Sequence, residues 1–289
     1  MAQTGHLKRV PAAADEPWLN PVTRLRIIIL VAIIGTWELV AASGWLLRDV
    51  VPSILTIGRA LTELLGHPDL KVTLAGHALW IPAFYWHLYV TISEVVVALV
   101  IGGTTGLAIG LLLGANPFLA KAFERFLYYL GPTPKIVFFP VMIMWFGVGP
   151  ESKIAMGTLS CFFPIVLSAA AGMRQIESVL IRVGRSFRLN TWQMVTKIYL
   201  PAMREPIVNG VRLGLGVAII GTLLAETKLS NRGIGYLIIQ AYSTFDMPRM
   251  YALLIVLFTL AVGANAMLGG LARSSSAEPA PVATRMPVQ

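Results

Sequence analysis

The sequence predicts an all-α, polytopic membrane protein with about six transmembrane helices. Apolar residues make up 56% of the 289 residues and charged residues only 13%, whereas a soluble domain carries about a quarter charged residues. The apolar residues also form long runs, and several reach the roughly 20 residues that a helix needs to cross about 30 Å of hydrocarbon. Composition and run length therefore both place the chain in the membrane class.

The predicted spans are long apolar runs separated by more polar loops. They cover residues 25–47, 88–114, 127–147, 152–173, 207–226 and 250–271. Together they define a transmembrane domain at 25–272. The tails at 1–24 and 273–289 are rich in Pro, Ala and Ser, and we expect both to be flexible and cytoplasmic.

The first span could also be a cleaved signal peptide. Arg24 and Arg26 precede its apolar stretch, and small residues near its end resemble a cleavage site. However, the polar lead-in is long, and the apolar stretch continues past Glu38 to about Leu47. A retained transmembrane helix is therefore the better interpretation.

The third span is interrupted by several residues that break helices or carry charge: Pro132, Pro134, Lys135 and Pro140. Such a helix is tolerated where neighbouring protein or water satisfies its freed backbone groups. We therefore expect this segment to face inward, as one broken span or as two short pieces, and Lys135 and Pro140 become candidates for lining a pathway. Lys135 could present positive charge to an anion there, or reach to the inner interface instead.

The distribution of Lys and Arg predicts the orientation. With the N-terminus inside, the loops and tails on that side hold fourteen Lys and Arg residues, against seven on the other side. Cytoplasmic loops are enriched in these residues, and an even number of spans then places both termini in the cytoplasm. The same enrichment explains the net charge of +9 without a nucleic-acid partner.

Glycines recur every four residues along the second span, which places them on one helix face. They are Gly102, Gly106, Gly110 and Gly114, and the fifth span has a shorter series in Gly210 and Gly214. Missing side chains let another helix backbone approach closely. Packing within one chain is the simpler interpretation, and a seam between two copies is the alternative.

Two carboxylates lie inside predicted spans, and an intramembrane ionisable residue is a functional candidate by default. Glu38 lies near the middle of the first span and Glu94 near the outer end of the second. Each could be hydrogen-bonded to a neighbouring helix or take part in a proton relay. The four histidines lie outside the predicted spans, and the single cysteine, Cys161, gives neither a disulfide framework nor a zinc site.

The loop at 174–206 is long, basic and predicted to be cytoplasmic. It reads as two short helices, the first from about Ser178 to Phe187. The second begins at Asn190, with Gln193 placed to complete a capping box. Its apolar face holds Met194, Val195 and Ile198, and Pro201 stops it. Such a pair could lie on lipid headgroups or dock on a soluble partner.

This loop resembles the EAA loop of ABC importer permeases, which begins Glu-Ala-Ala, bends at a glycine and ends in Ile-x-Leu-Pro. Ile198, Leu200 and Pro201 match the end of that pattern. Arg182, Val183 and Gly184 stand where Glu-Ala-Ala would, and Arg188 replaces the glycine at the bend. These residues, together with Val195, are the ones that the resemblance assigns to coupling.

Further stretches resemble the nitrate/sulfonate/taurine branch of these permeases. They include Trp37-Glu38, Trp145-Phe146-Gly147, Phe162-Phe163-Pro164-Ile165, Ala225-Glu226 and Gly233-Ile234-Gly235-Tyr236-Leu237. They occur in consistent order over residues 25–270. The resemblance therefore covers most of the chain and is far more specific than any single motif.

The resemblance implies the type I ABC importer architecture in a bacterial inner membrane. Two permease copies, expected to be a homodimer in lipid, would form the pathway. A cytoplasmic ABC ATPase dimer would drive it, and a solute-binding protein would deliver a small, anionic solute such as a sulfonate, taurine or nitrate. The chain has no Gly-x-x-x-x-Gly-Lys-Ser/Thr loop, so we expect it to bind no cofactor, with ATP and Mg on the partner ATPase.

Two other classes are compatible with a polytopic chain. An ion-coupled secondary transporter would show related halves with broken helices at the midplane, whereas this sequence has one strongly interrupted span and no convincing internal repeat. A membrane enzyme would show metal-ligand spacing or a nucleophile motif, and neither is found. Co-purification of an ATPase subunit would separate the permease from both alternatives.

Overall fold

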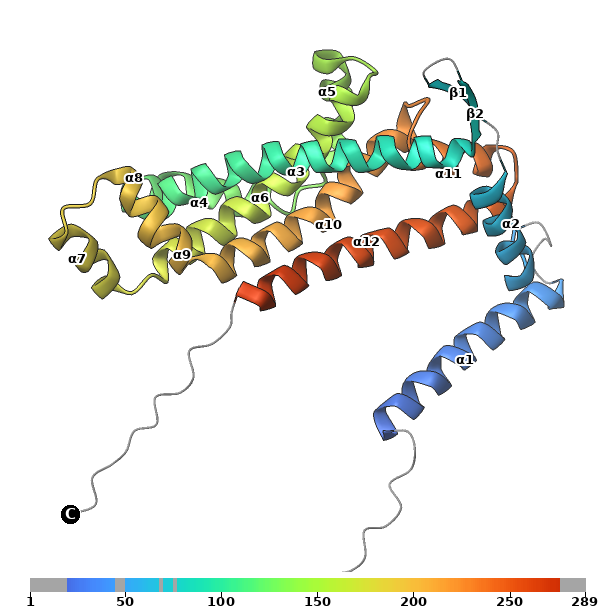
Figure 1. Ribbon diagram of the computed structural model, residues 1–289, viewed down its shortest axis with the longest axis horizontal. Helices are drawn as coiled ribbons and strands as arrows, with labels where there is room; N and C mark the ends of the chain where they lie inside the picture. Colours follow the sequence, from blue (N-terminus) through green and yellow to red (C-terminus); the bar gives the residue numbers. More distant parts are fainter. Residues whose placement is uncertain (1–19, 45–49, 68–69, 75–76, 276–289) are drawn as a thin grey trace, which may run out of the picture.

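The computed structural model describes residues 20–44, 50–67, 70–74 and 77–275, and its long helices form an elongated bundle (Figure 1). The elements in chain order are α1 (Pro21–Ser43), α2 (Ile54–Gly66), β1 (Leu70–Leu74), β2 (His77–Ile81), α3 (Ala83–Ala115), α4 (Pro117–Leu130), the 3-10 turn η1 (Lys135–Phe138), α5 (Phe139–Phe146), α6 (Pro150–Arg174), α7 (Ser178–Ser186), α8 (Thr191–Met194), the π-turn η2 (Val195–Tyr199), α9 (Leu200–Ala202), α10 (Arg204–Lys228), α11 (Ile234–Ser243) and α12 (Met247–Ser275).

The number of candidate membrane-crossing helices is compatible with the predicted six. Among the described residues, five helices are long and apolar enough to cross a membrane, namely α1, α3, α6, α10 and α12. The count is six when the shorter segments α4 and η1–α5, which meet at a bend of 95°, are taken as one broken span. The predicted all-α, polytopic class is therefore confirmed, and the interrupted third span is the bent pair.

The centre of the bundle is the packing of α3 and α10 on α6. The neighbours of the α3 glycines advance from Cys161 at Gly102 to Met173 at Gly114, so α3 and α6 run in the same direction. On α10, Gly210 meets Ser168 and Gly221 meets Ser160, so α10 runs in the opposite direction. The two ends of the bundle are called here the loop end, which carries α7 to α9, and the hairpin end, which carries the β1–β2 hairpin.

Because α3 and α6 are parallel, residues 116–149 must return the chain along the bundle. The first part of this return is α4, which lies against the loop-end half of α6 and is tied to it by the Arg174–Glu124 salt bridge at 2.8 Å. Pro132 and Pro134 lie between α4 and η1, where their missing N–H groups break the helix. Past the break, α5 stands out from the bundle (Figure 1).

The hairpin end contains elements that the sequence did not predict. An antiparallel hairpin pairs Leu70 with Ile81 and Leu74 with His77. Next to it, α2 begins at Ser53, whose hydroxyl accepts a hydrogen bond from the Thr56 N–H. Buried side chains of α2, α3, α11 and α12 pack together there, including Leu64, Phe84, Ile234, Leu237 and Leu253.

Helix α1 lies apart from the bundle along most of its length (Figure 1), and none of its residues is buried. It is held near its C-terminal end, where the Trp37 ring packs edge-on against Tyr251. The helix begins at Pro21, four residues before the predicted start, with proline at the first helical position. The predicted flexible tails fall largely on residues 1–19 and 276–289, which lie outside the described residues.

Candidate functional site: coupling loop and membrane pathway

The loop between α6 and α10 folds as predicted at its two helix starts and at its bend. Helix α7 covers Ser178–Ser186. The second helix begins with the predicted capping box, because Asn190 accepts from the Gln193 N–H at 2.8 Å and the Gln193 side chain accepts from the Asn190 N–H at 3.1 Å. A π-turn at 195–199 and the short α9, which includes Pro201, then lead into α10 at Arg204.

Arg188 occupies the bend with a left-handed backbone, at a φ of 50°. Two hydrogen bonds close the end of α7 around it. The Arg188 N–H donates to the Arg185 carbonyl at 2.9 Å, and the Leu189 N–H donates to the Gly184 carbonyl at 3.1 Å. This is the Schellman arrangement, whose left-handed position favours glycine. Arg188 therefore does the work of the family's bend glycine at a cost in backbone strain.

The predicted apolar face of the second loop helix packs against α7, and other apolar side chains of the loop are the exposed ones. Gly184 is buried against Met194 and Ile198, so that these side chains hold α7 onto the second helix. Val195 is half-buried, and so is Leu200. By contrast, Phe187 is 76% exposed and Trp192 is 74% exposed. The apolar surface available to a partner is thus led by Phe187 and Trp192, with Val179, Leu180 and Val183 of α7 also exposed. The predicted face of Met194, Val195 and Ile198 is buried or half-buried.

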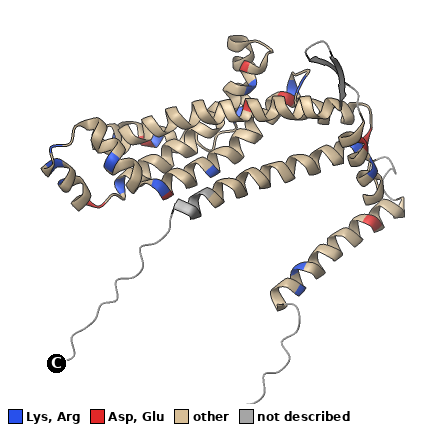
Figure 2. Cartoon of the chain, in the orientation of Figure 1, with Lys and Arg blue, Asp and Glu red and all other residues tan. Residues whose placement is uncertain are grey.

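Charge is unevenly distributed along the molecule. Figure 2 shows Lys and Arg gathered at the loop end, while long stretches of the spans carry no charged residue. Arg182, Arg185 and Arg188 are all exposed on or just after α7. Arg182, at the position of the family's acidic residue, therefore presents positive charge to whatever meets the loop.

The predicted glycine series pack helix on helix within one chain. A Cβ added at Gly110 would lie 2.5 Å from the Ala169 Cβ and 2.7 Å from the Val166 carbonyl oxygen. Gly102, Gly106 and Gly114 meet α6 in the same way. On α10, Gly210 and Gly214 meet Ser168 and Ile165, also on α6. Both series are thus directed at the central helix of the same chain.

A charged cluster is buried toward the hairpin end of this three-helix core. Glu94 from α3, Lys153 from α6 and Glu226 from α10 are 4%, 2% and 0% exposed, and the three ionisable groups lie near one another in the core. The Lys153 ammonium also donates to the carbonyls of Val148 and Gly149. Burying ionisable groups of opposite sign near one another offsets part of the free-energy cost of removing each from water. A lone buried charge would have no such compensation.

Glu226 also caps the first turn of α11, together with two residues of α3. The Gly235 N–H donates to Glu226 Oε2 at 2.6 Å, and the Thr91 hydroxyl donates to Oε1 at 2.7 Å. The Ile234 N–H donates to the Thr91 oxygen at 2.8 Å, and the Gly233 N–H donates to His87 Nδ1 at 3.0 Å. Three successive amides of a helix N-terminus, which a helix cannot satisfy itself, are thus satisfied by side chains from other helices.

A small pocket lies where η1 meets α6 and α10. It has a volume of about 240 Å³ and includes Thr133, Lys135 and Ser160 in its lining. The Lys135 ammonium donates to the Gly131 carbonyl and lies 5.2 Å from the centre of the Phe163 ring. The pathway candidate Lys135 therefore lies at the break in the third span and is among the residues that line this cavity, while its ammonium is held by Gly131 and Phe163, outside the lining.

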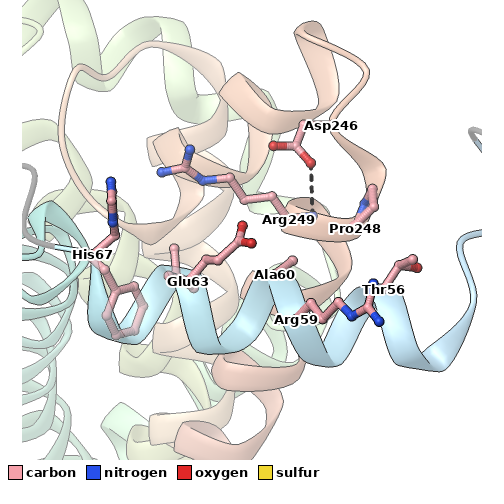
Figure 3. Close-up of a pocket in the computed structure, with 10 residues that line it drawn as sticks. Thr56, Arg59, Ala60, Glu63, His67, Asp246, Pro248 and Arg249 are labelled. Atoms are coloured by element: carbon pink, nitrogen blue, oxygen red, sulfur yellow. Dashed lines mark hydrogen bonds between the residues drawn. The ribbon is translucent and has the colours of Figure 1, made fainter.

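A larger cavity of about 590 Å³ opens at the hairpin end, between α2 and the start of α12 (Figure 3). Its lining combines both signs of charge: Arg59 and Glu63 from α2 with Asp246 and Arg249 near the start of α12. The Arg249 N–H donates to Asp246 Oδ1 at 3.2 Å, which caps α12. Because side chains of both charges line this cavity, it does not favour anionic over cationic ligands.

The other sequence candidates lie apart from these features. Glu38 is exposed on α1 and accepts from the Ile54 N–H at 3.1 Å, so its carboxylate interacts with the N-terminus of α2. Pro140 is exposed on α5. Only Lys135 and Glu94 among the four pathway candidates lie within the bundle, and the structure does not bring them together.

Two residues of the buried cluster escaped the sequence reasoning. Lys153 is one of the seven Lys and Arg residues that the predicted orientation assigns to the outer side, and Glu226 enters the sequence analysis only through the Ala225-Glu226 resemblance. A usable signal existed, because Glu94, Lys153 and Glu226 all lie near the same end of their predicted spans. Opposite charges at one depth predict an ion-paired layer.

Comparisons with known proteins agree with this architecture. Residues 106–276 match the family described as the binding-protein-dependent transport system inner membrane component. The chain belongs to this family. It is thus a membrane-embedded subunit of a transport system, not an enzyme, and family membership implies an ATPase and a solute-binding protein as partners.

Individual relatives support the same placement of this permease. The chain is 28% identical to the putative aliphatic sulfonates transport permease protein SsuC of Bacillus subtilis, over 86% of this chain and 84% of that protein. It is also 28% identical to the taurine transport system permease protein TauC of Escherichia coli, over 78% and 79% of the two chains. A structure of the MetNI methionine ABC transporter matches with a TM-score of 0.60 at 19% identity, covering 67% of this chain and 96% of that one, which shows a common fold.

Proposed function

We propose that this permease forms the membrane pathway of an importer for a small anionic solute such as a sulfonate, taurine, nitrate or a similar organic anion. A solute-binding protein delivers the solute at the hairpin end, and an ATPase drives transport from the loop end. The proposed solute class rests on the relatives that transport sulfonates and taurine by name.

The observation that carries the proposal is the rigid loop between α6 and α10. Its two helices are fixed by a capping box, a Schellman bend and the packing of Gly184 on Ile198. Two large aromatic side chains, Phe187 and Trp192, project from this rigid unit. A rigid unit transmits the movement of a bound ATPase to α6 and α10, whereas a flexible loop would absorb it.

The loop end is the cytoplasmic end in this proposal. Helix α12 ends toward that end and α1 approaches the hairpin end with its C-terminal end (Figure 1). Both termini therefore lie on the cytoplasmic side of a bacterial inner membrane, in agreement with the excess of Lys and Arg there. The ATP and Mg used in transport bind the partner ATPase, and this chain binds no cofactor.

A second copy of the permease completes the pathway. An exposed apolar stripe runs along α10, beside the pocket where η1 meets α6 and α10, through Leu213, Val217, Ile220 and Leu224. Their spacing of three and four residues places them on one helix face. The stripe and the exposed surface of α1 are covered by the second copy or by lipid, and we propose a homodimer.

Co-purification tests this function directly. The full-length permease is expressed with ABC ATPase and solute-binding-protein subunits from the same organism, and the ATPase recovered in mild detergent is measured. Phe187→Ala and Trp192→Ala together are expected to reduce recovered ATPase at least tenfold. Phe118→Ala is the matched control, since Phe118 is 77% exposed and begins α4 at the same end of the bundle.

The control and the double variant are both expected to unfold at the temperature of the unsubstituted permease. Equal ATPase recovery with the double variant would contradict the docking assignment. Failure to recover an ATPase with the unsubstituted permease would contradict the proposed function as a whole.

A further inference from the structure

The outward face of α7 can be located from its one buried residue. Gly184 is the buried residue of this helix, and it lies against Met194 and Ile198 of the second loop helix. Consecutive residues of an α-helix are about 100° apart around its axis, so Arg182, two residues earlier, is about 200° from Gly184. Arg182 therefore lies near the middle of the face that α7 turns away from the second loop helix.

Arg182 is the charged group at the centre of a partly apolar surface. Val179, one turn earlier, is 52% exposed and Val183 is 46% exposed. Ser186 lies one turn later, and its hydroxyl donates back to the Arg182 carbonyl at 3.0 Å. The guanidinium has a planar set of donors that fits a carboxylate through two parallel hydrogen bonds.

The loop contains few acidic residues that could neutralise this charge. Residues 174–206 hold six Lys and Arg residues against two Glu residues, Glu177 and Glu205. Among the described residues, no carboxylate forms a salt bridge with the Arg182 guanidinium. The positive charge of this face is thus available to solvent or to a partner.

Helix α7 lies outside the hydrocarbon layer. Its neighbours α6 and α10 each have 25 residues, which corresponds to about 37 Å and already exceeds the roughly 30 Å of hydrocarbon. Among the described elements, α7 extends furthest along the bundle at the loop end (Figure 1). A soluble protein on that side of the membrane can therefore reach its outward face.

We propose that Arg182 pairs with a carboxylate on the ATPase surface that receives the loop, and that this pair selects the ATPase partner. The inference rests on the proposed function and identifies the charge of the partner's surface. The resemblance places Glu at this position in related permeases, so an acidic ATPase surface would repel such a permease and attract this one. Like charges that face each other disfavour the wrong partner.

Anionic lipid headgroups are the alternative partner for a basic loop. Attraction to lipid depends on the charge of the bilayer, and other cations at the loop end would serve nearly as well as Arg182. A pair with a carboxylate depends instead on one position and on the presence of the ATPase. These differences make the two partners separable by experiment.

Recovery of the ATPase in mild detergent tests the pair. The full-length permease is expressed with ABC ATPase and solute-binding-protein subunits from the same organism. Arg182→Glu is expected to lower the recovered ATPase by about tenfold or more, because two facing carboxylates repel each other. Arg182→Lys keeps the charge and should remain within about threefold of the unsubstituted permease. Equal recovery with Arg182→Glu and with the unsubstituted permease overturns the proposal.

Lys121→Glu is the matched control, since it reverses the same charge at an exposed position of α4. It should leave ATPase recovery unchanged, and a loss equal to that of Arg182→Glu would overturn the proposal by showing a diffuse effect of charge. Hydrogen exchange of the α7 amides in the isolated permease should be the same for Arg182→Glu as for the unsubstituted chain.

Restoration by the ATPase separates a lost pair from a misfolded loop. Each Asp and Glu on the surface of the ATPase is changed to Arg in turn and expressed with Arg182→Glu. One of these substitutions is expected to return recovery to within about threefold of the unsubstituted pair, which a misfolded loop would not allow. Failure of every substitution to restore recovery overturns the proposal.

The lipid alternative is tested in nanodiscs made with phosphatidylcholine alone or with added phosphatidylglycerol. Slower exchange of the α7 amides on addition of the ATPase, equal in the two lipids, is expected. Slower exchange caused by phosphatidylglycerol, with no effect of the ATPase, would overturn the proposal in favour of lipid.

The outcome for this pair can be distinguished from the outcome for the proposed function. Recovery of the ATPase that is insensitive to Arg182→Glu would keep the permease assignment and reject the pair. Failure to recover an ATPase with the unsubstituted permease would reject both.

Discussion

Thr91 and Glu226 are joined by a hydrogen bond of 2.7 Å, although they lie 135 residues apart in the sequence. Both side chains are buried, and together they receive the N–H groups of Ile234 and Gly235. This bond therefore links α3, α10 and the start of α11 at one point. The position of α11 at the hairpin end therefore depends on polar contacts buried within the bundle.

Glu226→Ala should strongly destabilise the permease. It leaves the Thr91 hydroxyl and the Gly235 N–H without their acceptors and removes one of two carboxylates near Lys153, at an expected cost of roughly 3–5 kcal/mol. Glu226→Gln keeps an acceptor and should cost less. Thermal unfolding in detergent measures both. Glu205→Ala is the control on the same helix, since Glu205 is exposed, and equal unfolding temperatures for the two alanine variants would contradict the role assigned to Glu226.

Gly110→Ala should disrupt the packing of α3 on α6. The added Cβ would lie 2.7 Å from a backbone oxygen, which a side-chain rotation cannot relieve, so we expect a loss of about 1–3 kcal/mol. Gly103→Ala is the matched control, because its Cβ would meet only the Ile165 Cδ1 at 3.9 Å. Unfolding by denaturant in detergent compares the two. A Gly103→Ala variant as unstable as Gly110→Ala would contradict the packing explanation, because alanine by itself favours a helix more than glycine does.

Arg188→Gly should stabilise the coupling loop. An L-residue at a φ of 50° carries strain that glycine does not, and after allowing for the greater freedom of unfolded glycine the gain is about 0.5–1 kcal/mol. Arg185→Gly, inside α7, should instead destabilise by about 1 kcal/mol. Hydrogen exchange of the α7 amides measures both. Slower exchange in Arg188→Gly is expected, and faster exchange would show that the guanidinium contributes a contact worth more than the strain.

Ile198→Asp should disrupt the loop itself, whereas substitutions of the exposed Phe187 and Trp192 should weaken only the binding of the ATPase. Ile198 packs on Gly184 within the loop, so a carboxylate there separates α7 from the second helix before any partner binds. Protease cleavage between α7 and α8 in the isolated permease should therefore increase at least several-fold. Phe187→Ala should leave cleavage unchanged and reduce only ATPase recovery. Normal protease resistance in Ile198→Asp would return this residue to the partner-facing surface.

Much of the fold could be predicted from the sequence because the lipid bilayer constrains it. Bilayer thickness sets the length of the apolar runs, and the need to satisfy every backbone amide in lipid makes those runs helical. The interruption at Pro132 and Pro134 was visible for the same reason, since proline removes a donor wherever it stands. The hairpin and α2 were missed because they lie outside the apolar runs, where neither constraint acts.

The functional features also divide into those set by local sequence and those set by the packing of distant helices. Capping by Asn190 and Gln193 is local, so the sequence alone determined where the second loop helix begins, just as it determined the glycine faces of α3 and α10. Only the tertiary structure decided that Ile198 faces Gly184 while Trp192 faces outward, and that Lys153 is buried beside Glu94 and Glu226. Local spacing fixes a side chain's direction on its own helix, whereas its partners depend on how helices distant in sequence pack together.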